Sequence, residues 1–228
     1  MGTLASNRKG YIQGASQSSY ENALTGGGGT AYDSQTGNVT TAVQYFKNTG
    51  RGGGTFRFIR TFLHFDTTSI SGGSGFQLQL TSTAGNSEDG AFNVQVIKHT
   101  AGTSNGGELA NSDFDNIDKT TTYSNSTAYA SSGTQTINLN SAAATQIINN
   151  NDFNPALLLA SDVAEEEEDP LESSGDISLG INFGNAINLV YTDPVSGYSN
   201  KIAGLTAASI NKVSGLAVAS VSKVNGVD

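Results

Sequence analysis

The stretch from Thr55 to Asp66, which reads TFRFIRTFLHFD, decides the fold. It is rich in aromatic and β-branched residues, which favour strands over helices, and it lies between a glycine run at 52–54 and turn-forming residues at 67–69. Successive side chains of a strand point to opposite faces. One face would carry Phe56, Phe58, Phe62 and His64, and the other Arg57, Ile59, Leu63 and Phe65. Large apolar residues on both faces predict a central strand of a sandwich rather than a half-exposed edge strand.

Two neighbouring stretches, 76–80 (FQLQL) and 92–96 (FNVQV), alternate strictly between apolar and polar residues. This alternation is typical of a strand with one solvated face. Further strands are predicted at 42–46, 134–139, 156–159, 177–183 and 187–191. The helical candidate is 141–149, with Asn140 or Ser141 as the N-cap. Many short strands separated by turn residues predict an all-β protein, an antiparallel jelly-roll β-sandwich with a short C-terminal β-repeat segment.

The composition supports this class of fold and excludes several functions. Of the 228 residues only 14% are charged, against roughly 25% in an average soluble domain. The net charge is -9. Sequence-independent binding to nucleic acid needs clustered Lys and Arg, so nucleic acid is excluded as a partner, and anionic membrane surfaces are disfavoured too. The absence of Cys excludes disulfides, zinc–cysteine sites, iron–sulfur clusters and thiol catalysis.

The chain combines the composition of an extracellular surface protein with an N-terminus that resembles no export signal. No apolar stretch follows the basic pair Arg8-Lys9, as a secretory signal requires. No segment approaches 18 consecutive apolar residues, so membrane insertion is not expected. Particle proteins of a lytic virus, made in the host cytoplasm and released by lysis, satisfy both observations. A secreted chain whose signal has been removed is the alternative.

The last thirty residues repeat with a period of 11. Lys201, Lys212 and Lys223 share one position of this repeat, and Gly204, Gly215 and Gly226 share another. Each copy is predicted to form a turn at Gly followed by a short apolar strand. We therefore divide the chain into a sandwich domain at 1–196 and an assembly segment at 197–228. A strand set this short cannot bury its own apolar side, so it is expected to dock either on its own sandwich or on a neighbouring subunit.

Several segments resemble a jelly-roll module that occurs in virion proteins of tailed bacteriophages and in bacterial surface proteins. They are the opening 10–12 (GYI), 19–23 (SYENA), the block 60–70 (RTFLHFDTTSI) and 137–147, which begins INLN. The module is similar to carbohydrate-binding-module and DNRLRE-type sandwiches. The C-terminal copies, such as 223–227 (KVNGV), resemble repeats near the ends of phage virion proteins. The resemblance covers roughly residues 5–195 and implies fold more than function. The run 26–29 and the acidic loop 162–176 depart from it.

Two acidic clusters are candidates for a cation site. The stretch 162–172 contains the run EEEED and a further Glu. Calcium prefers oxygen ligands from loops, but EF-hand spacing is absent, so a solvated loop of like charges is the favoured interpretation over a calcium site. The second cluster is Asp113 with Asp115 and Asp118, and its first part, 111–113 (NSD), is predicted to form an Asx-type turn or cap rather than a cation site. No other cofactor is expected.

Candidate catalytic and binding residues are few. His64 and Asp66 share one strand face, but geometry and not adjacency defines a triad, so His64 is predicted to be a core or rim residue. No pair of carboxylates is singled out for glycoside hydrolysis. Sugar recognition on sandwiches uses exposed aromatic rings, and Tyr123 and Tyr129, in a Ser/Thr/Asn-rich loop, are the candidate contact surface. The alternative is that both rings cap the core.

These observations predict a non-enzymatic structural protein of a tailed-phage virion. It would be displayed on the particle surface, as a capsid decoration protein or a tail-fibre or adsorption component, and anchored through its C-terminal repeats. Its expected partners are other virion proteins, further copies of itself in a homo-oligomer, and a host surface glycan. The alternative is a glycan-binding module, acting in host attachment or in a secreted protein. A polysaccharide-cleaving enzyme is a third, less favoured hypothesis.

Overall fold

The computed structural model describes residues 1–34, 41–50, 54–85, 92–102, 107–129, 133–165 and 175–194, and two short strands at 212–213 and 216–217. The chain divides into two compact units, which we call the sandwich unit (Met1–Thr192) and the repeat unit (Asp193–Asp228). The sandwich unit is an all-β, sandwich-like fold of antiparallel strands.

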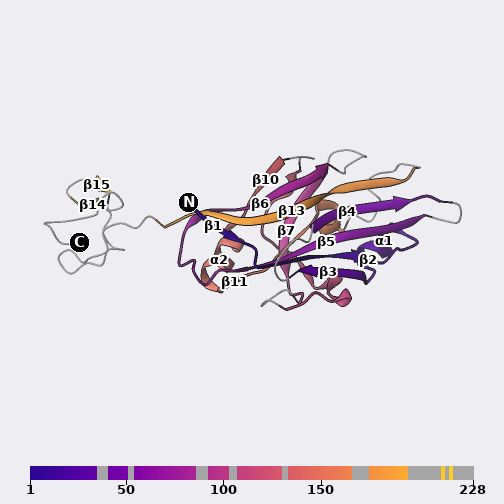
Figure 1. The fold of residues 1–228 in the computed structure, drawn as a ribbon, viewed down its shortest axis with the longest axis horizontal. Helices are drawn as coiled ribbons and strands as arrows, with labels where there is room; N and C mark the ends of the chain where they lie inside the picture. Colours follow the sequence, from indigo (N-terminus) through magenta and orange to yellow (C-terminus); the bar gives the residue numbers. More distant parts are fainter. Residues whose placement is uncertain are drawn as a thin grey trace. The chain divides into compact units, whose positions relative to one another are not determined.

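Seven strands form the first layer of the sandwich unit, which faces the viewer in Figure 1. In spatial order they are β10 (Gly133–Asn138), β6 (Ser74–Gly85), β13 (Ile177–Thr192), β4 (Thr41–Asn48), β5 (Thr55–Asp66), β2 (Arg8–Gly14) and β3 (Gly28–Ser34). All six pairings between them are antiparallel. The short β1 (Gly2–Ala5) pairs with the end of β13.

The second layer branches from the middle of β5. β2 pairs along one edge of β5, so β4 and β12 (Pro155–Leu159) share the opposite edge. β4 pairs with the first half of β5, and β12 pairs with Thr61 and Phe62 further along. The layer then continues through β7 (Asn93–His99) to β8 (Ile117–Thr122) and β9 (Thr127–Ala128), while β11 (Asp152–Phe153) pairs with the end of β5. The prediction of a central strand at 55–66 is confirmed.

The core lies between the two layers. In β6 the residues Phe76, Leu78 and Leu80 are buried while the intervening Gln77 and Gln79 are not, so the predicted alternation is confirmed. β7 repeats the pattern with buried Val94 and Val96. Full burial of one such aliphatic side chain contributes about 1.5–3 kcal/mol. The apolar positions of the alternating strands therefore hold the layers together.

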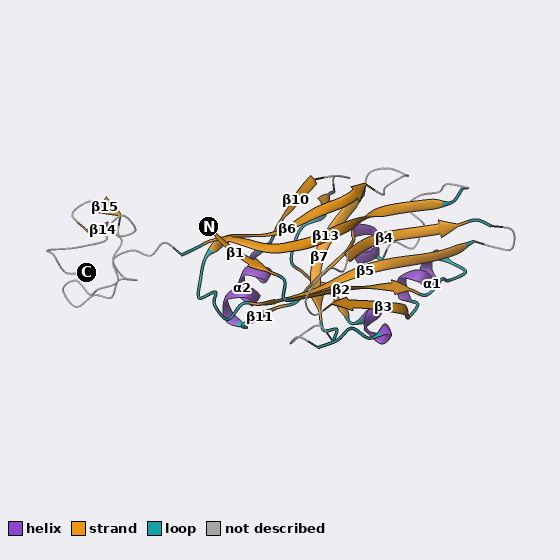
Figure 2. Ribbon diagram, in the orientation of Figure 1, coloured by secondary structure: helices purple, strands orange, loops and turns teal. Residues whose placement is uncertain are grey.

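Short helices close the fold (Figure 2). The predicted helix is α2 (Ser141–Asn149), and its N-cap is Asn140, whose side-chain oxygen accepts a hydrogen bond from the backbone N–H of Ala143. Two further helices were not anticipated, α1 (Tyr20–Thr25) and α3 (Ala160–Ala164), while the segment expected to form a turn is the 3-10 turn η2 (Asn111–Asp115). Each is about one turn long, too short for a periodic apolar pattern to reveal it. No helix within the described residues is long and apolar enough to cross a bilayer.

Asp113 performs the capping role expected of the second acidic cluster. Its carboxylate accepts hydrogen bonds from the backbone N–H groups of Ala110 and Gly102 and from the side-chain amide of Asn116. These bonds fix η2 against the loop before it. The prediction of a turn at this position is confirmed.

The repeat unit contains one described element, a small hairpin. β14 (Lys212–Val213) pairs antiparallel with β15 (Leu216–Ala217). Lys212 opens β14, and a short strand follows Gly215, as the repeat pattern predicts. The other marked repeat positions, Lys201, Gly204, Gly215, Lys223 and Gly226, lie outside the described residues.

Candidate ligand-binding face

The first layer has an outer face, opposite its buried side. Cross-strand partners lie on the same face of a sheet, and the register places Phe46 of β4 opposite both Arg57 of β5 and Ser178 of β13. Their strand neighbours Tyr45 and Phe58 are buried on the core side. Phe46, Arg57 and Ser178 therefore form one row across three strands on the outer face, and all three side chains are partly exposed.

Arg57 and Phe46 are in direct contact in this row. The guanidinium carbon lies 4.4 Å from the ring centroid of Phe46, a cation–π arrangement. Among the described residues, Arg57 makes no hydrogen bond or ion pair with a carboxylate. The arginine is thus held by a ring rather than by a counter-ion, and its N–H donors stay open to an incoming ligand.

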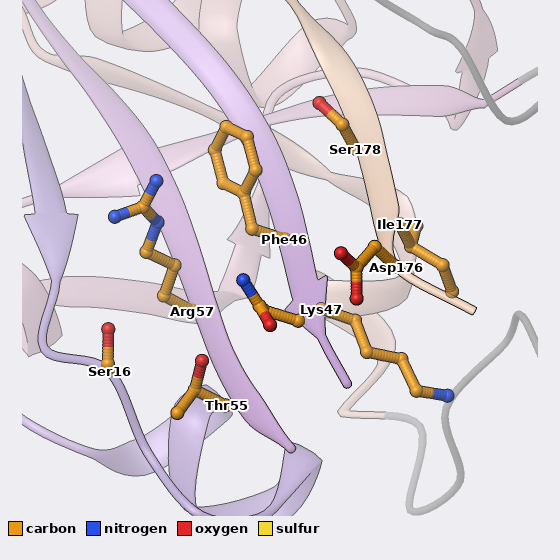
Figure 3. A pocket seen from close by; sticks show the side chains of 9 residues that line it. Ser16, Phe46, Lys47, Thr55, Arg57, Asp176, Ile177 and Ser178 are labelled. Atoms are coloured by element: carbon orange, nitrogen blue, oxygen red, sulfur yellow. The ribbon is translucent and has the colours of Figure 1, made fainter. Parts of the chain in front are cut away.

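A pocket of about 370 Å³ opens beside this pair (Figure 3), within the size range of small-molecule sites. Its other lining residues are Ser16, Lys47, Asn48, Thr55, Asp176, Ile177 and Ser178. They come from the ends of β4, β5 and β13 and from the chain between β2 and α1. The pocket therefore lies where three strands of the outer face meet at one end of the sheet.

Asp176 supplies the negative charge of the pocket. Its Oδ1 accepts hydrogen bonds from the backbone N–H (2.6 Å) and the hydroxyl (2.8 Å) of Thr49. These two bonds favour the ionised form and lower the pKa of the carboxyl below its ordinary value. Asn48 in turn accepts a hydrogen bond from the N–H of Gly50. The two bonds from Thr49 to Asp176 tie the segment that follows β4 to the residue that precedes β13.

A pair of stacked rings lies elsewhere on the same outer face. Tyr11 of β2 is opposite Tyr32 of β3, and their rings stack with centroids 4.7 Å apart. Burial, followed by the neighbouring Tyr32, raises the pKa of Tyr11. Tyr32 is 42% exposed. The outer face therefore presents aromatic surface at two places.

The rest of the outer face is polar and almost uncharged. Side chains of β10, β6, β13 and β4 form amide and hydroxyl pairs, namely Gln77 with Asn138, Thr81 with Thr134, and Gln44 with Asn182. Each strand contributes a polar residue at alternate positions because the intervening residues face the core. The face is thus a sheet of hydrogen-bonding groups with few full charges.

Arg60, on the opposite face of β5, is in a different environment. It is fully buried, and all five of its N–H donors are used. Nε and one terminal nitrogen bind the two oxygens of Asp162 at 2.8 and 2.7 Å; the others reach the Leu24 and Phe114 carbonyls and the Asp115 carboxylate. Burial alone would lower the pKa of Arg60, but Asp162 and Asp115 outweigh it and raise the pKa.

The prediction that the acidic stretch is a solvated loop is wrong at its first residue, Asp162. Asp162 was expected to belong to a solvated loop, but it is 1% exposed in α3 and forms the ion pair with Arg60. Lys119 also reaches it, at 3.3 Å, and binds Glu165 at 3.2 Å. Only Glu165 of this trio is open to solvent. Residues 166–174 of the stretch lie outside the described residues.

The two tyrosines predicted as a contact surface lie in the core, which corrects that expectation. Tyr123 is 1% exposed, packs on the ring of Phe153 and donates its hydroxyl to Gln146. Tyr129 is 7% exposed and stacks on Phe92. Burial raises the pKa of Tyr123 to about 12 and that of Tyr129 as well. Both rings cap the core, in line with the alternative, whereas Tyr32 on the outer face is exposed.

The histidines are buried in hydrogen-bonded positions. His64 Nδ1 lies 2.8 Å from the side-chain oxygen of Asn154, which confirms its expected core role. His99 Nε2 donates to the Leu63 carbonyl at 2.8 Å, and Nδ1 accepts from the Ala101 N–H at 3.2 Å. Burial lowers the pKa of His99 to about 4, so the ring is neutral. Asp66 accepts from the backbone and hydroxyl of Thr68 in the following turn.

Within the described part of the chain, no three His, Asp or Glu side chains are grouped to hold a metal ion. The calcium site that was weighed as the less favoured alternative falls mainly on residues outside the described part of the chain. In comparisons with known proteins, no family model matches the chain and no curated protein is significantly similar to it. The candidate site therefore rests on its own geometry: the ring, the open arginine and the fixed carboxylate at one end of the outer face.

Proposed function

We propose that this chain is a non-enzymatic structural protein of a tailed-phage particle, with the sandwich unit displayed on the surface and the C-terminal repeats acting as the anchor. The observation that carries the proposal is the division of the chain at 192/193 into a unit with its own core and a repeat unit. A domain that buries its own core does not need the repeats to fold. The repeats are then free to serve attachment.

The surface of the sandwich unit suits display on a particle. Most of its outer face carries amides and hydroxyls, and its aromatic surface is divided between two separate places, so it resists non-specific association. The net charge of -9 keeps it from nucleic acid. The resemblance to phage virion modules supports the same proposal, including a jelly-roll arrangement of the strands and either a capsid-decoration or a tail-fibre location. The expected partners are other virion proteins and further copies of the chain.

Deleting residues 199–228 tests the anchor. We expect the shortened chain to stay soluble and to keep the β-rich circular-dichroism spectrum, because its core is complete without them. It should no longer join the particle or the oligomer. A matched control removes one 11-residue copy, 212–222, which preserves the repeat period and should weaken attachment only in part. Aggregation of the shortened chain would show instead that the repeats complete the domain's own core.

A second function, glycan recognition in host attachment, is favoured by a specific observation. The outer face combines two sites of aromatic surface with polar neighbours, Phe46 beside Arg57 and the Tyr11–Tyr32 stack. Rings stack on the apolar faces of sugars while polar neighbours bind their hydroxyls. This function is compatible with display on a particle. A glycan array probed with the purified chain tests it, and the absence of binding to every array glycan would leave the scaffolding role alone.

A further inference from the structure

We propose that the pocket beside Phe46, Arg57 and Asp176 binds one uncharged hexose unit of a glycan through a pair of neighbouring hydroxyls. The inference rests on the glycan-recognition function proposed above and names its site and ligand class. It is independent of how the protein is anchored, since every lining residue belongs to the sandwich unit.

The first argument is the combination of donors and acceptors. Arg57 offers N–H donors that no described residue uses, and Asp176 offers a carboxylate oxygen, Oδ2, beside the one that Thr49 occupies. An anion would be attracted by the arginine and repelled by the aspartate; a cation would meet the reverse. A hydroxyl group both donates and accepts. Two adjacent hydroxyls on a neutral ring therefore match the pocket better than a charged group does.

The second argument is that both charged groups are already fixed. The Phe46 ring holds the Arg57 guanidinium, and two hydrogen bonds from Thr49 hold Asp176. Long flexible side chains lose conformational freedom when they bind a ligand, and that loss weakens binding. Here the loss has occurred on folding. The pocket is therefore preorganised, although a single hexose is a weak ligand by its size.

The third argument is the local charge. Lys47 also lines the pocket, but strand alternation places it on the other face of β4 from Phe46 and Asn48. Figure 3 shows its side chain directed away from Arg57. The charges that face the opening are then one arginine and one aspartate. Thr55, Ser178 and Ser16 add uncharged hydroxyls around them. The site as a whole suits a polar, neutral ligand.

The experiment titrates the full chain with D-glucose, D-galactose, D-mannose and N-acetyl-D-glucosamine in turn, followed by amide chemical shifts in NMR spectra. We expect at least one sugar to shift the amides of Asn48, Arg57 and Asp176 with millimolar affinity. Arg57→Ala and Asp176→Asn should each weaken that binding about ten-fold or more, since each removes hydrogen bonds to a charged group. Arg57→Lys keeps the charge but loses the planar donor fork and should weaken it as well.

Gln77→Ala is the matched control, because Gln77 lies on the same outer face but away from the pocket. It should leave the affinity unchanged, and the thermal unfolding of all variants shows whether each is folded. D-Glucuronate and inorganic phosphate form the second arm. If these anions bind more tightly than every neutral sugar, and Asp176→Asn strengthens them, the pocket is an anion site and the proposal is overturned.

Absence of shifts at the pocket with all four sugars also overturns it. If the chain binds glycans on an array but no sugar shifts the amides of the pocket, glycan recognition would stand and its site would lie elsewhere, for instance at the Tyr11–Tyr32 stack. Failure of the pocket and failure of the wider function are thus distinguishable. Particle incorporation should be unaffected by every pocket variant.

Discussion

Arg57 and Arg60 are three residues apart on the same strand, and each lies over a phenylalanine ring, yet they differ in burial and in hydrogen bonding. Arg60 is on the face that α1, η2 and α3 cover, where each contributes a group to its guanidinium. Arg57 is on the outer face, where its guanidinium lies over the ring of Phe46. The strand itself sets neither role. What covers each face decides whether an arginine becomes part of the structure or stays open to a ligand.

The physical reason is the cost of removing a charge from water. A buried ion costs several kcal/mol unless partners satisfy it, and Arg60 persists because all five donors are used and its ring neighbour Phe114 lies 3.8 Å from the guanidinium. Arg57 is partly exposed to water and needs no such partners. Substitutions at the two positions test this explanation, because it predicts very different losses in the free energy of unfolding.

The largest effect is expected at the buried position. Arg60→Leu leaves the Asp162 carboxylate buried with Lys119 as its one cationic partner among the described residues, and it leaves the Leu24 and Phe114 carbonyls without this donor. Removing one partner of a buried pair costs about 3–5 kcal/mol. Urea denaturation should show this loss in the free energy of unfolding. The double variant Arg60→Leu/Asp162→Leu should recover a large part of it, and a double variant as unstable as the single one would refute the pairing argument.

His99, a buried side chain that becomes a cation on protonation, should make the free energy of unfolding depend on pH. His99 has a pKa of about 4 in the folded protein against about 6.5 when unfolded. Between these values the unfolded chain binds the extra proton, so the free energy of unfolding falls as the pH falls. The slope should approach about 1.4 kcal/mol per pH unit, and the total loss about 3 kcal/mol. Protonation would set an Nδ1–H against the Ala101 N–H.

The matched variant for this measurement is His99→Gln, which keeps a neutral donor. Its overall stability should be lower, but its free energy of unfolding should be nearly flat between about pH 6.5 and about pH 5. The carboxyls with lowered pKa values, Asp66, Asp118 and Asp176, titrate at lower pH and are common to both proteins. An equal slope in the two proteins would assign the pH dependence to other groups.

The smallest effect is expected at Arg57. Arg57→Ala removes a partly exposed side chain with one ring contact, so the free energy of unfolding should change by less than about 1 kcal/mol. The same urea titration as for Arg60 measures it. A loss as large as that of Arg60→Leu would mean that Arg57 is structural. The contrast between the two faces of β5 would then disappear.

Local signals in the sequence predicted much of this fold. Alternation in 76–80 and 92–96, and an Asn before an Ala-rich turn, each depend on neighbours within a few residues, and the structure confirms them. The Arg60–Asp162 pair did not follow from the sequence because its members are 102 residues apart. A run of acidic residues looks the same in the sequence whether or not one of its aspartates is buried. Charge patterning alone cannot tell a solvated carboxylate from one that a helix carries into the interior.

The candidate site was missed for a related reason. Phe46 and Arg57 meet only through the register of β4 on β5, and the sequence does not specify which residues lie opposite each other. Tyr123 and Tyr129 were selected because a polar loop surrounds them in the sequence, yet packing places them inside. Tyr11 and Tyr32 belong to strands that pair across a helix and a turn. Exposure of a ring is a property of the sheet rather than of the local segment.

β5 belongs to both layers of the sandwich unit, because the second layer branches from its middle. Ile59 pairs with both β2 and β4, and two residues later Thr61 pairs with β2 and β12. Peeling either layer away would strip hydrogen bonds from the strand on which the other depends. The sandwich unit should for this reason lose both layers in one cooperative step under mechanical load, rather than one layer at a time.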